Sequence, residues 1–269
     1  MHSTGGLRPE TVAAISAVKE ALRLARLGAG DVHAKVGRDV VTDADVAVED
    51  QLRDALGRAA PWPVVGEERG GEVPDAGGYW LVDPICGTRN FASGIPLFAV
   101  NTALAEGGRV SISVVGDGAT GDVLVAELGR GAWRVRDDAT APVLLATSPS
   151  SLVVDFGAWP KAGSERDRAA RQVAAIARAD RWDVRSFATT LSLAWVAGGR
   201  IAACVLFAGP GAVHTAAGSL LVAEAGGRVT DDQGGQWSLG ASSLVCAATD
   251  RLHAEILELL DSADCADSA

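Results

Sequence analysis

The feature that most constrains the fold is a change of pattern near the middle of the chain. Short apolar segments separated by Gly- and Asp-containing turns predict a meander of antiparallel strands in the first half. These segments are residues 79–82, 99–105, 110–115, 122–127 and 129–135. After a linking stretch at residues 139–149, apolar strands alternate with helical segments, which predicts a layered α/β half.

The expected elements divide the chain into two halves, residues 1–145 and 146–269, packed as one unit. In the first half, helices are predicted at residues 9–29 and 42–56. In the second half, they are predicted at residues 166–179, 190–198, 213–225 and 251–261. Strands of the second half are predicted at residues 152–156, 183–185, 201–207 and 243–247, and residues 31–41 are expected to be irregular. Thr42 is a good N-cap for the second helix, and Asp43 and Asp45 favour its positive end. The fold class is therefore α/β (α+β).

Charge and composition exclude several functions. The net charge is −10 over 269 residues, which argues against a nucleic-acid partner, because phosphate contacts need clustered Lys and Arg. No apolar run approaches the ~18 residues of a membrane span, and residues 1–10 lack the features of a signal peptide. The four cysteines lie far apart, so neither a disulfide framework nor a zinc ribbon is indicated. We expect a cytoplasmic protein without a membrane partner.

Three ordered motifs span nearly the whole chain. The first is D-V-V-T-D-A-D at 39–45, with Glu49 following. The second is G-E-E at 66–68 with W-L-V-D-P-I-C-G-T-R-N-F at 80–91, and the third is V-H-T-A-A-G at 213–218 with E-A-G-G at 224–227. Together they resemble the inositol monophosphatase superfamily, with its D-x-V-T-x-x-D, W-x-V-D-P-I-D-G-T-x-N-F and W-D-x-A-A-G motifs. The resemblance implies an αβαβα layered sandwich.

The resemblance also implies a magnesium-dependent phosphomonoesterase site, from which this chain departs. Glu67, Asp83, the Ile85 carbonyl and Thr88 match the ligand positions, but Cys86 stands where D-P-I-D has its second Asp. His214 likewise stands where W-D has its Asp. Thiolate and imidazole are poor ligands for Mg²⁺, which prefers hard oxygen ligands. The segment at 204–210 is apolar where inositol phosphatases carry an acidic residue.

These substitutions leave three interpretations. In the first, the chain is a catalytically silent family member. In the second, a transition metal such as Zn²⁺ is bound by Glu67, Asp83, Cys86 and His214. In the third, which we favour, Cys86 is a nucleophile and His214 is its base, since two positions that ligate one metal lie close together. Backbone N–H groups of Gly87 and Thr88 would then lower the thiol pKa and hold an oxyanion.

A Cys–His pair works best when a third group orients the imidazole. Asp117 is our first choice, because the strand that it ends is expected to run toward the same sheet edge as Cys86. Asp83 is the second choice. A turn role in Asp117-Gly118 is the alternative for Asp117.

The Cys and His substitutions are similar to those of the Dieckmann cyclases that release tetramates and pyridones from biosynthetic assembly lines. This resemblance implies a β-ketoacyl-aminoacyl thioester substrate on an acyl or peptidyl carrier protein, and no metal or other cofactor. Cys86 would take the acyl group, His214 would transfer protons, and a carbon–carbon bond would close the ring. Leu206 and Phe207 would contact the acyl chain of the substrate. A homodimer is one possible assembly. The alternatives are a phosphomonoesterase with altered ligands and a silent binding subunit.

Overall fold

The larger of two main sheets has seven strands in the order β3-β4-β5-β6-β7-β8-β9. Its strands are β3 Val64–Gly66, β4 Gly78–Cys86, β5 Ala99–Glu106, β6 Arg109–Asp117, β7 Val123–Glu127, β8 Gly131–Val135 and β9 Val143–Leu144. β3 pairs parallel with β4, and the other pairs are antiparallel, as expected for a meander. The computed structural model describes residues 6–35, 39–136, 141–158, 163–209 and 211–265, so residues 139–140 of the predicted link lie outside it.

The smaller sheet has five strands in the order β11-β10-β12-β14-β13. They are β10 Val153–Ala158, β11 Asp183–Arg185, β12 Ala203–Phe207, β13 Arg228–Thr230 and β14 Leu244–Ala247. β10 runs parallel to β11 and β12, while β14 is antiparallel to its neighbours.

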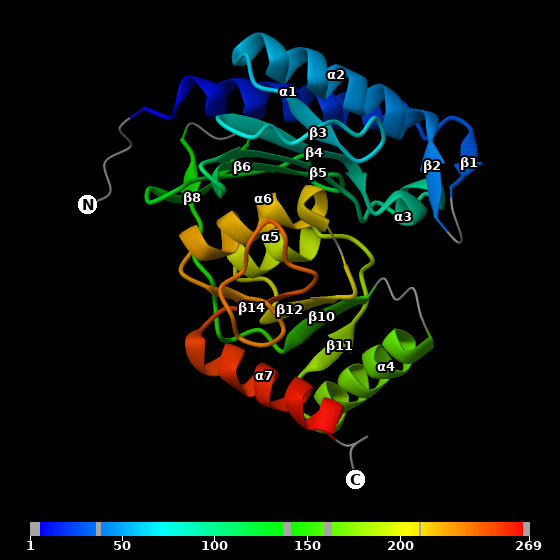
Figure 1. Cartoon of the computed structure of the whole chain (residues 1–269), viewed down its shortest axis with the longest axis vertical. Helices are drawn as coiled ribbons and strands as arrows, with labels where there is room; N and C mark the ends of the chain where they lie inside the picture. The colour runs from blue at the N-terminus through cyan, green and yellow to red at the C-terminus, as the bar shows by residue number, and fades with distance from the viewer. Residues whose placement is uncertain (1–5, 36–38, 137–140, 159–162, 210, 266–269) are drawn as a thin grey trace.

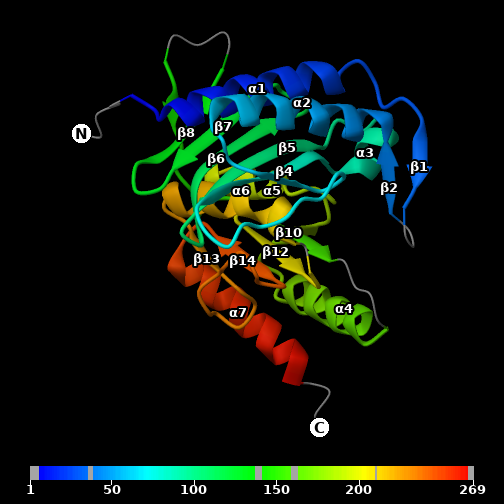
Figure 2. The same cartoon turned by 45° about the horizontal axis from the view of Figure 1, so that its top comes forward.

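The helices complete five layers, which Figures 1 and 2 show from two directions. α1 (Pro9–Ala25) and α2 (Asp43–Ala59) cover the outer face of the seven-stranded sheet, and α5 (Leu191–Ala197) and α6 (Gly211–Glu224) lie between the sheets. α4 (Gly163–Arg178) and α7 (Asp250–Cys265) cover the far face of the smaller sheet. The αβαβα sandwich predicted from the sequence is therefore confirmed.

Buried apolar side chains form three clusters: one between α1 and α2 and the seven-stranded sheet, one around α5 and α6 between the two sheets, and one between the smaller sheet and α4 and α7. The central cluster contains residues of both sheets together with α5 and α6, and Cys86 belongs to it. The structure therefore places the candidate nucleophile in the layer between the two sheets.

The structure corrects the sequence analysis at several short elements. Residues 31–41, expected to be irregular, contribute a small hairpin of β1 (Val32–Ala34) and β2 (Val40–Thr42). α3 (Thr88–Ala92), β9 and β13 were not predicted either. These segments have two to five residues, and segments this short carry too little periodicity to be recognised.

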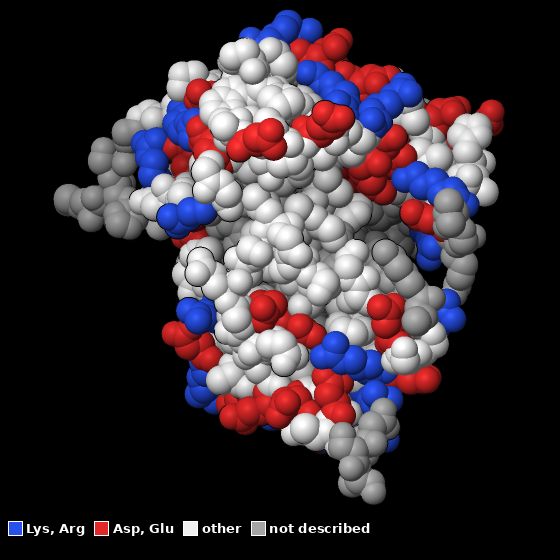
Figure 3. Space-filling model, viewed as in Figure 1, with Lys and Arg blue, Asp and Glu red and all other residues white. Residues whose placement is uncertain are grey.

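Charged side chains are intermixed on the face seen in Figure 3, where blue and red groups lie side by side over the upper and lower helices. This face shows a band of uncharged residues across its middle rather than one large basic patch. In the part of the chain that the structure describes, helices fall short of the length and apolar character needed to cross a membrane.

Candidate active site

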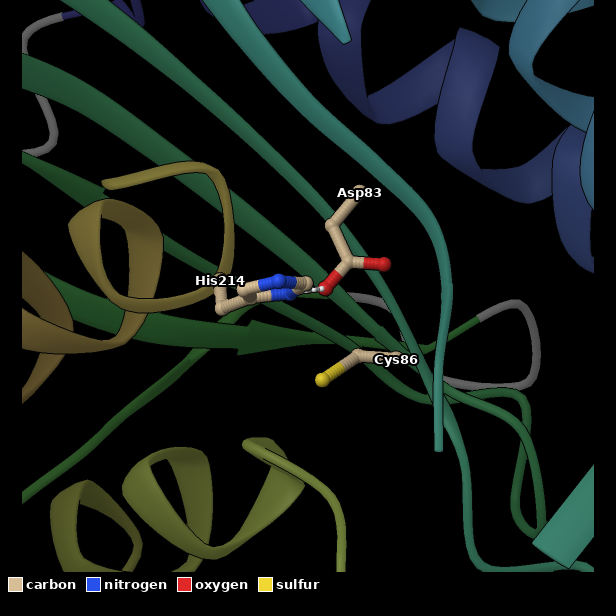
Figure 4. Close-up of side chains that lie close together, drawn as sticks. All are labelled: Asp83, Cys86 and His214. Carbon is tan, nitrogen blue, oxygen red and sulfur yellow. Dashed lines mark hydrogen bonds and ion pairs between the residues drawn. The ribbon is translucent and has the colours of Figure 1, made fainter. Parts of the chain in front are cut away.

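The end of β4 and the first turn of α6 bring together three side chains from distant parts of the sequence. Asp83 and Cys86 lie at the end of β4, where the pairing with β5 shifts register between them. His214 lies in the first turn of α6. In Figure 4 the imidazole points toward the Asp83 carboxylate, and the Cys86 thiol lies nearby.

The three side chains lie close together. His214 Nδ1 lies 2.7 Å from Asp83 Oδ2, and the ligand-type atoms of Asp83, Cys86 and His214 lie within 4.8 Å of one another. Asp83 contacts Nδ1, so a proton exchange with the thiol would use Nε2. Asp83 and Cys86 are buried, whereas the His214 side chain is 24% exposed, so the site reaches solvent on the histidine side.

The protonation states of the triad follow from burial and from the Asp83 charge. Burial raises the pKa of the Cys86 thiol and the Asp83 charge raises it further, against hydrogen bonds from His214 and Thr190. Burial alone would lower the pKa of His214, but Asp83 raises it well above its ordinary value. Both shifts favour the protonated forms of the thiol and of the imidazole. The lowered thiol pKa expected from the Gly87 and Thr88 N–H groups is not found, because burial outweighs hydrogen bonding.

Sequence reasoning missed two residues that contact the triad. The Thr190 N–H donates to Cys86 Sγ over 3.2 Å, and Thr190 Oγ1 lies 2.9 Å from the same sulfur. Asn101 Nδ2 donates to Thr190 Oγ1 over 3.0 Å and lies 3.5 Å from Asp83 Oδ2. Thr190 immediately precedes α5. A threonine at the start of a predicted helix is a sequence signal that could have drawn attention to it. Asn101 carries a signal as a lone amide in an apolar strand.

Glu67 and Asp83 supply the acidic side of the site. Burial and the Asp83 charge raise the pKa of Glu67 to about 8, although His214 and Lys35 act in the opposite direction. Glu67 Oε2 lies 4.0 Å from His214 Nδ1, and Lys35 Nζ lies 3.3 Å from Glu67 Oε1. Asp83 Oδ1 is buried without a hydrogen-bond partner among the described residues. Glu67, Asp83, Cys86 and His214 therefore fit a transition metal better than Mg²⁺.

Residues of the first motif, at 39–45, form hydrogen bonds with the turn that follows Cys86. Thr42 caps α2 through a capping box with Asp45, and Thr88 Oγ1 donates to Asp45 Oδ1 over 3.1 Å. Gly87 precedes α3 with a φ of 103°, a left-handed conformation that favours glycine. A Cβ at this position would also lie 2.8 Å from the Leu97 carbonyl oxygen. Gly87 and Thr88 thus shape the turn that follows Cys86.

The structure gives Asp117 a different role from the one predicted. Its strand does end at the expected edge, because Asp117 pairs with Ala99, which in turn pairs with Cys86. The carboxylate, however, accepts the N–H groups of Ala119 and Thr120 and lies 3.8 Å from Arg200. Asp117 therefore shapes its own turn, and Asp83 contacts His214. Two strand spacings separate β4 from β6, about 10 Å, which places Asp117 too far from the thiol.

The two predicted lining residues lie on opposite faces of β12. Leu206 is buried in the central cluster with Cys86, so it lies on the side of the sheet that faces the site. Phe207 belongs to the outer cluster, and the guanidinium of Arg168 lies 4.5 Å from its ring centre. The prediction that Phe207 lines the acyl chain is therefore wrong, because consecutive side chains of a strand point to opposite faces.

The structure is that of a layered αβαβα protein with a polar site where the end of β4 meets the first turn of α6. The chain belongs to the inositol monophosphatase family, which it matches over residues 7–264. A histidinol-phosphatase of Mycobacterium tuberculosis is 35% identical over 248 residues, which cover 88% of this chain and 91% of that protein. An inositol-1-monophosphatase of Caulobacter vibrioides is 34% identical, with 86% of this chain and 91% of that protein covered. The structure of the suppressor protein suhB from Bartonella henselae matches with a TM-score of 0.83 at 26% identity, covering 94% of this chain and 98% of that one.

Proposed function

We propose that this family member is a cysteine-dependent acyltransferase that closes a ring by Dieckmann condensation. The observation that supports this proposal is the Asp83–His214–Cys86 arrangement, in which a buried carboxylate holds His214 Nδ1 at 2.7 Å. A thiol and an imidazole replace two carboxylates of the family's metal site. Nucleophilic catalysis requires a thiol beside an oriented base.

The first proposed step transfers the acyl group from a carrier protein to Cys86. In its base form, His214 accepts the thiol proton at Nε2 while Sγ attacks the thioester carbonyl of a β-ketoacyl-aminoacyl carrier. The new carbon–sulfur bond forms, the bond to the carrier thiol breaks, and the carrier thiolate takes the proton from His214. A thioester exchanges with a thiol at little thermodynamic cost, so this step needs no metal.

The second proposed step closes the ring. The carbon between the two carbonyls gives its proton to His214, and the carbanion attacks the acyl-cysteine carbonyl. A carbon–carbon bond forms, the carbon–sulfur bond breaks, and Cys86 recovers the proton as the tetramate or pyridone leaves. The acyl or peptidyl carrier protein is the proposed partner, and Leu206 lies on the side of β12 that faces this site.

The first proposed step adds the mass of the acyl group to the protein, which mass spectrometry can detect. We expect the full-length protein to gain one acyl group from a simple thioester surrogate, and peptide mapping to place it on Cys86. Cys86→Ala should gain none, whereas Cys265→Ala, which removes the exposed thiol of α7, should be acylated like the wild type. Acylation of Cys86→Ala at the wild-type level would disprove the nucleophile assignment.

A metal-dependent phosphomonoesterase is the second candidate function. The phosphatase names of the relatives favour it, and so does the unpaired Oδ1 of Asp83 beside Glu67. Glu67, Asp83, Cys86 and His214 would hold the metal, which would supply an activated water. We expect purified protein to work without metal and to leave a generic phosphate ester intact. Near-stoichiometric zinc that chelation removes together with activity would favour this candidate. A purified protein that shows neither acylation of Cys86 nor phosphate-ester hydrolysis would favour a silent binding subunit.

A further inference from the structure

The sulfur of Cys86 receives two contacts from Thr190, on the side of the site formed by α5. The backbone N–H of Thr190 donates to Sγ over 3.2 Å, and Oγ1 lies 2.9 Å from Sγ. Both residues are buried, so water does not compete for these contacts. A buried thiol held by two groups of one residue has a fixed orientation.

Asn101 determines which way the Thr190 hydroxyl points. The Asn101 amide donates one hydrogen to Thr190 Oγ1 over 3.0 Å, and its nitrogen lies 3.5 Å from Asp83 Oδ2. Oγ1 accepts a hydrogen from Asn101, and its own hydrogen can be donated to Sγ. With the hydroxyl donating, two donors converge on the sulfur, and the thiol hydrogen then points away from Thr190.

The segment that carries Thr190 is fixed at both of its ends. Asp155 Oδ1 accepts the Phe187 N–H over 3.0 Å, and Asn90 Nδ2 donates to the Phe187 carbonyl over 2.7 Å. Thr189 Oγ1 donates to the Cys86 carbonyl over 2.8 Å. These bonds keep Thr190 at one position relative to β4.

We infer that Thr190, held by Asn101, is a positioning residue that aims the Cys86 sulfur at His214. This role rests on the proposed use of Cys86 as a nucleophile, and it explains why a hydroxyl and a lone amide are buried beside the thiol. Asn101 also lies 3.5 Å from the orienting Asp83, so one side chain contacts both Thr190 and this carboxylate.

Alkylation of the full-length protein by iodoacetamide tests this role without any carrier or thioester. Thr190→Val keeps the size of the side chain and the backbone N–H but removes the hydroxyl. We expect it to slow Cys86 alkylation about tenfold, the scale of a lost hydrogen bond to an ionising group. Thr190→Ser restores the hydroxyl and should stay within about threefold of the wild type.

Two internal references separate positioning from a general disturbance. The exposed Cys265 is alkylated in the same sample and should keep its rate in every variant. Thr102→Val removes another buried hydroxyl, which contacts the Val114 carbonyl oxygen at 3.4 Å, and should leave Cys86 alkylation unchanged. If Thr190→Val does not fold, Thr190→Ala serves in its place with the same expected loss.

The outcomes distinguish this inference from the cyclase proposal. Wild-type alkylation rates in folded Thr190→Val or Thr190→Ala, or a failure of Thr190→Ser to restore the rate, would overturn the positioning role. With a thioester surrogate, we expect Thr190→Val to lower the maximal acylation rate and leave the half-saturating concentration unchanged. A wild-type protein that accepts no thioester but shows the Thr190-dependent alkylation would reject the cyclase and retain the positioning role.

Discussion

Asp83 acts through one carboxylate oxygen, while its other oxygen is buried with no partner in the described part of the chain. The charge of this residue has two effects on its neighbours. It raises the pKa of His214 above its ordinary value and, together with burial, raises the pKa of Glu67 to about 8. A single buried carboxylate thus favours protons on the neighbouring groups and fixes the imidazole orientation.

Replacing the orienting carboxylate tests which aspartate belongs to the triad. We expect Asp83→Asn to lower the rate of Cys86 acylation on the order of 10⁴-fold, because the amide no longer holds the required imidazole tautomer. Asp117→Asn should lose less than about threefold, since the Asp117 carboxylate accepts N–H groups of its own turn. The measurement is single-turnover acylation by mass spectrometry. The reverse order of losses would restore Asp117 as the orienting residue.

At the scale of elements, α7 is joined to the smaller sheet through a buried histidine. His253 Nε2 lies 2.9 Å from Thr230 Oγ1 of β13. Burial lowers the pKa of His253 below its ordinary value, and the positive charge of Arg228 lowers it further. The packing of α7 therefore favours the neutral form of this side chain.

The depressed pKa of His253 predicts a pH-dependent contribution to stability. Its contribution is complete above the unfolded-state pKa of about 6.5, and it decreases as pH falls because the unfolded chain then binds a proton that the folded protein binds less well. We expect the difference in unfolding free energy between wild type and His253→Gln to shrink from pH 7.5 to pH 5.5. Urea unfolding at several pH values measures it, and a constant difference would contradict the prediction.

At the scale of the whole molecule, α5 and α6 join the two sheets into one unit. The central apolar cluster includes residues of both helices and both sheets, and His214 and Thr190 lie at the beginnings of these helices. The helices contact each other closely at Gly218, where a Cβ would lie 2.5 Å from Leu193 Cβ. The position of the site therefore depends on the packing of this middle layer.

A larger side chain at Gly218 should separate α5 from α6. We expect Gly218→Val to lower the unfolding free energy by about 1–3 kcal/mol, because rotation of the leucine cannot move its Cβ away. Gly57→Val is the matched control, since Gly57 is exposed in α2 and a Cβ there meets nothing within 4 Å. Denaturant unfolding measures both variants, and equal losses would show that the α5–α6 contact tolerates the added volume.

The sequence by itself determined the layered fold and the two substituted positions of the site. The meander, the alternating second half and the three motifs are local patterns, so they can be recognised from the sequence alone. The motif spacing also sufficed to place Cys86 and His214 together, because it matched positions that share one metal in the family.

Only the tertiary structure decided which groups support the thiol. Asp83 rather than Asp117 contacts His214, because Asp117 bonds within its own turn and two strand spacings separate β6 from β4. Thr190 reaches Cys86 from 104 residues away along the chain, and Asn101 reaches Thr190 from 89 residues away, through packing that no local pattern encodes. Because side chains alternate along β12, Phe207 lies in the cluster between the smaller sheet and α4 and α7. Contacts across layers depend on how whole elements pack, whereas motifs and periodicity depend on neighbours in sequence.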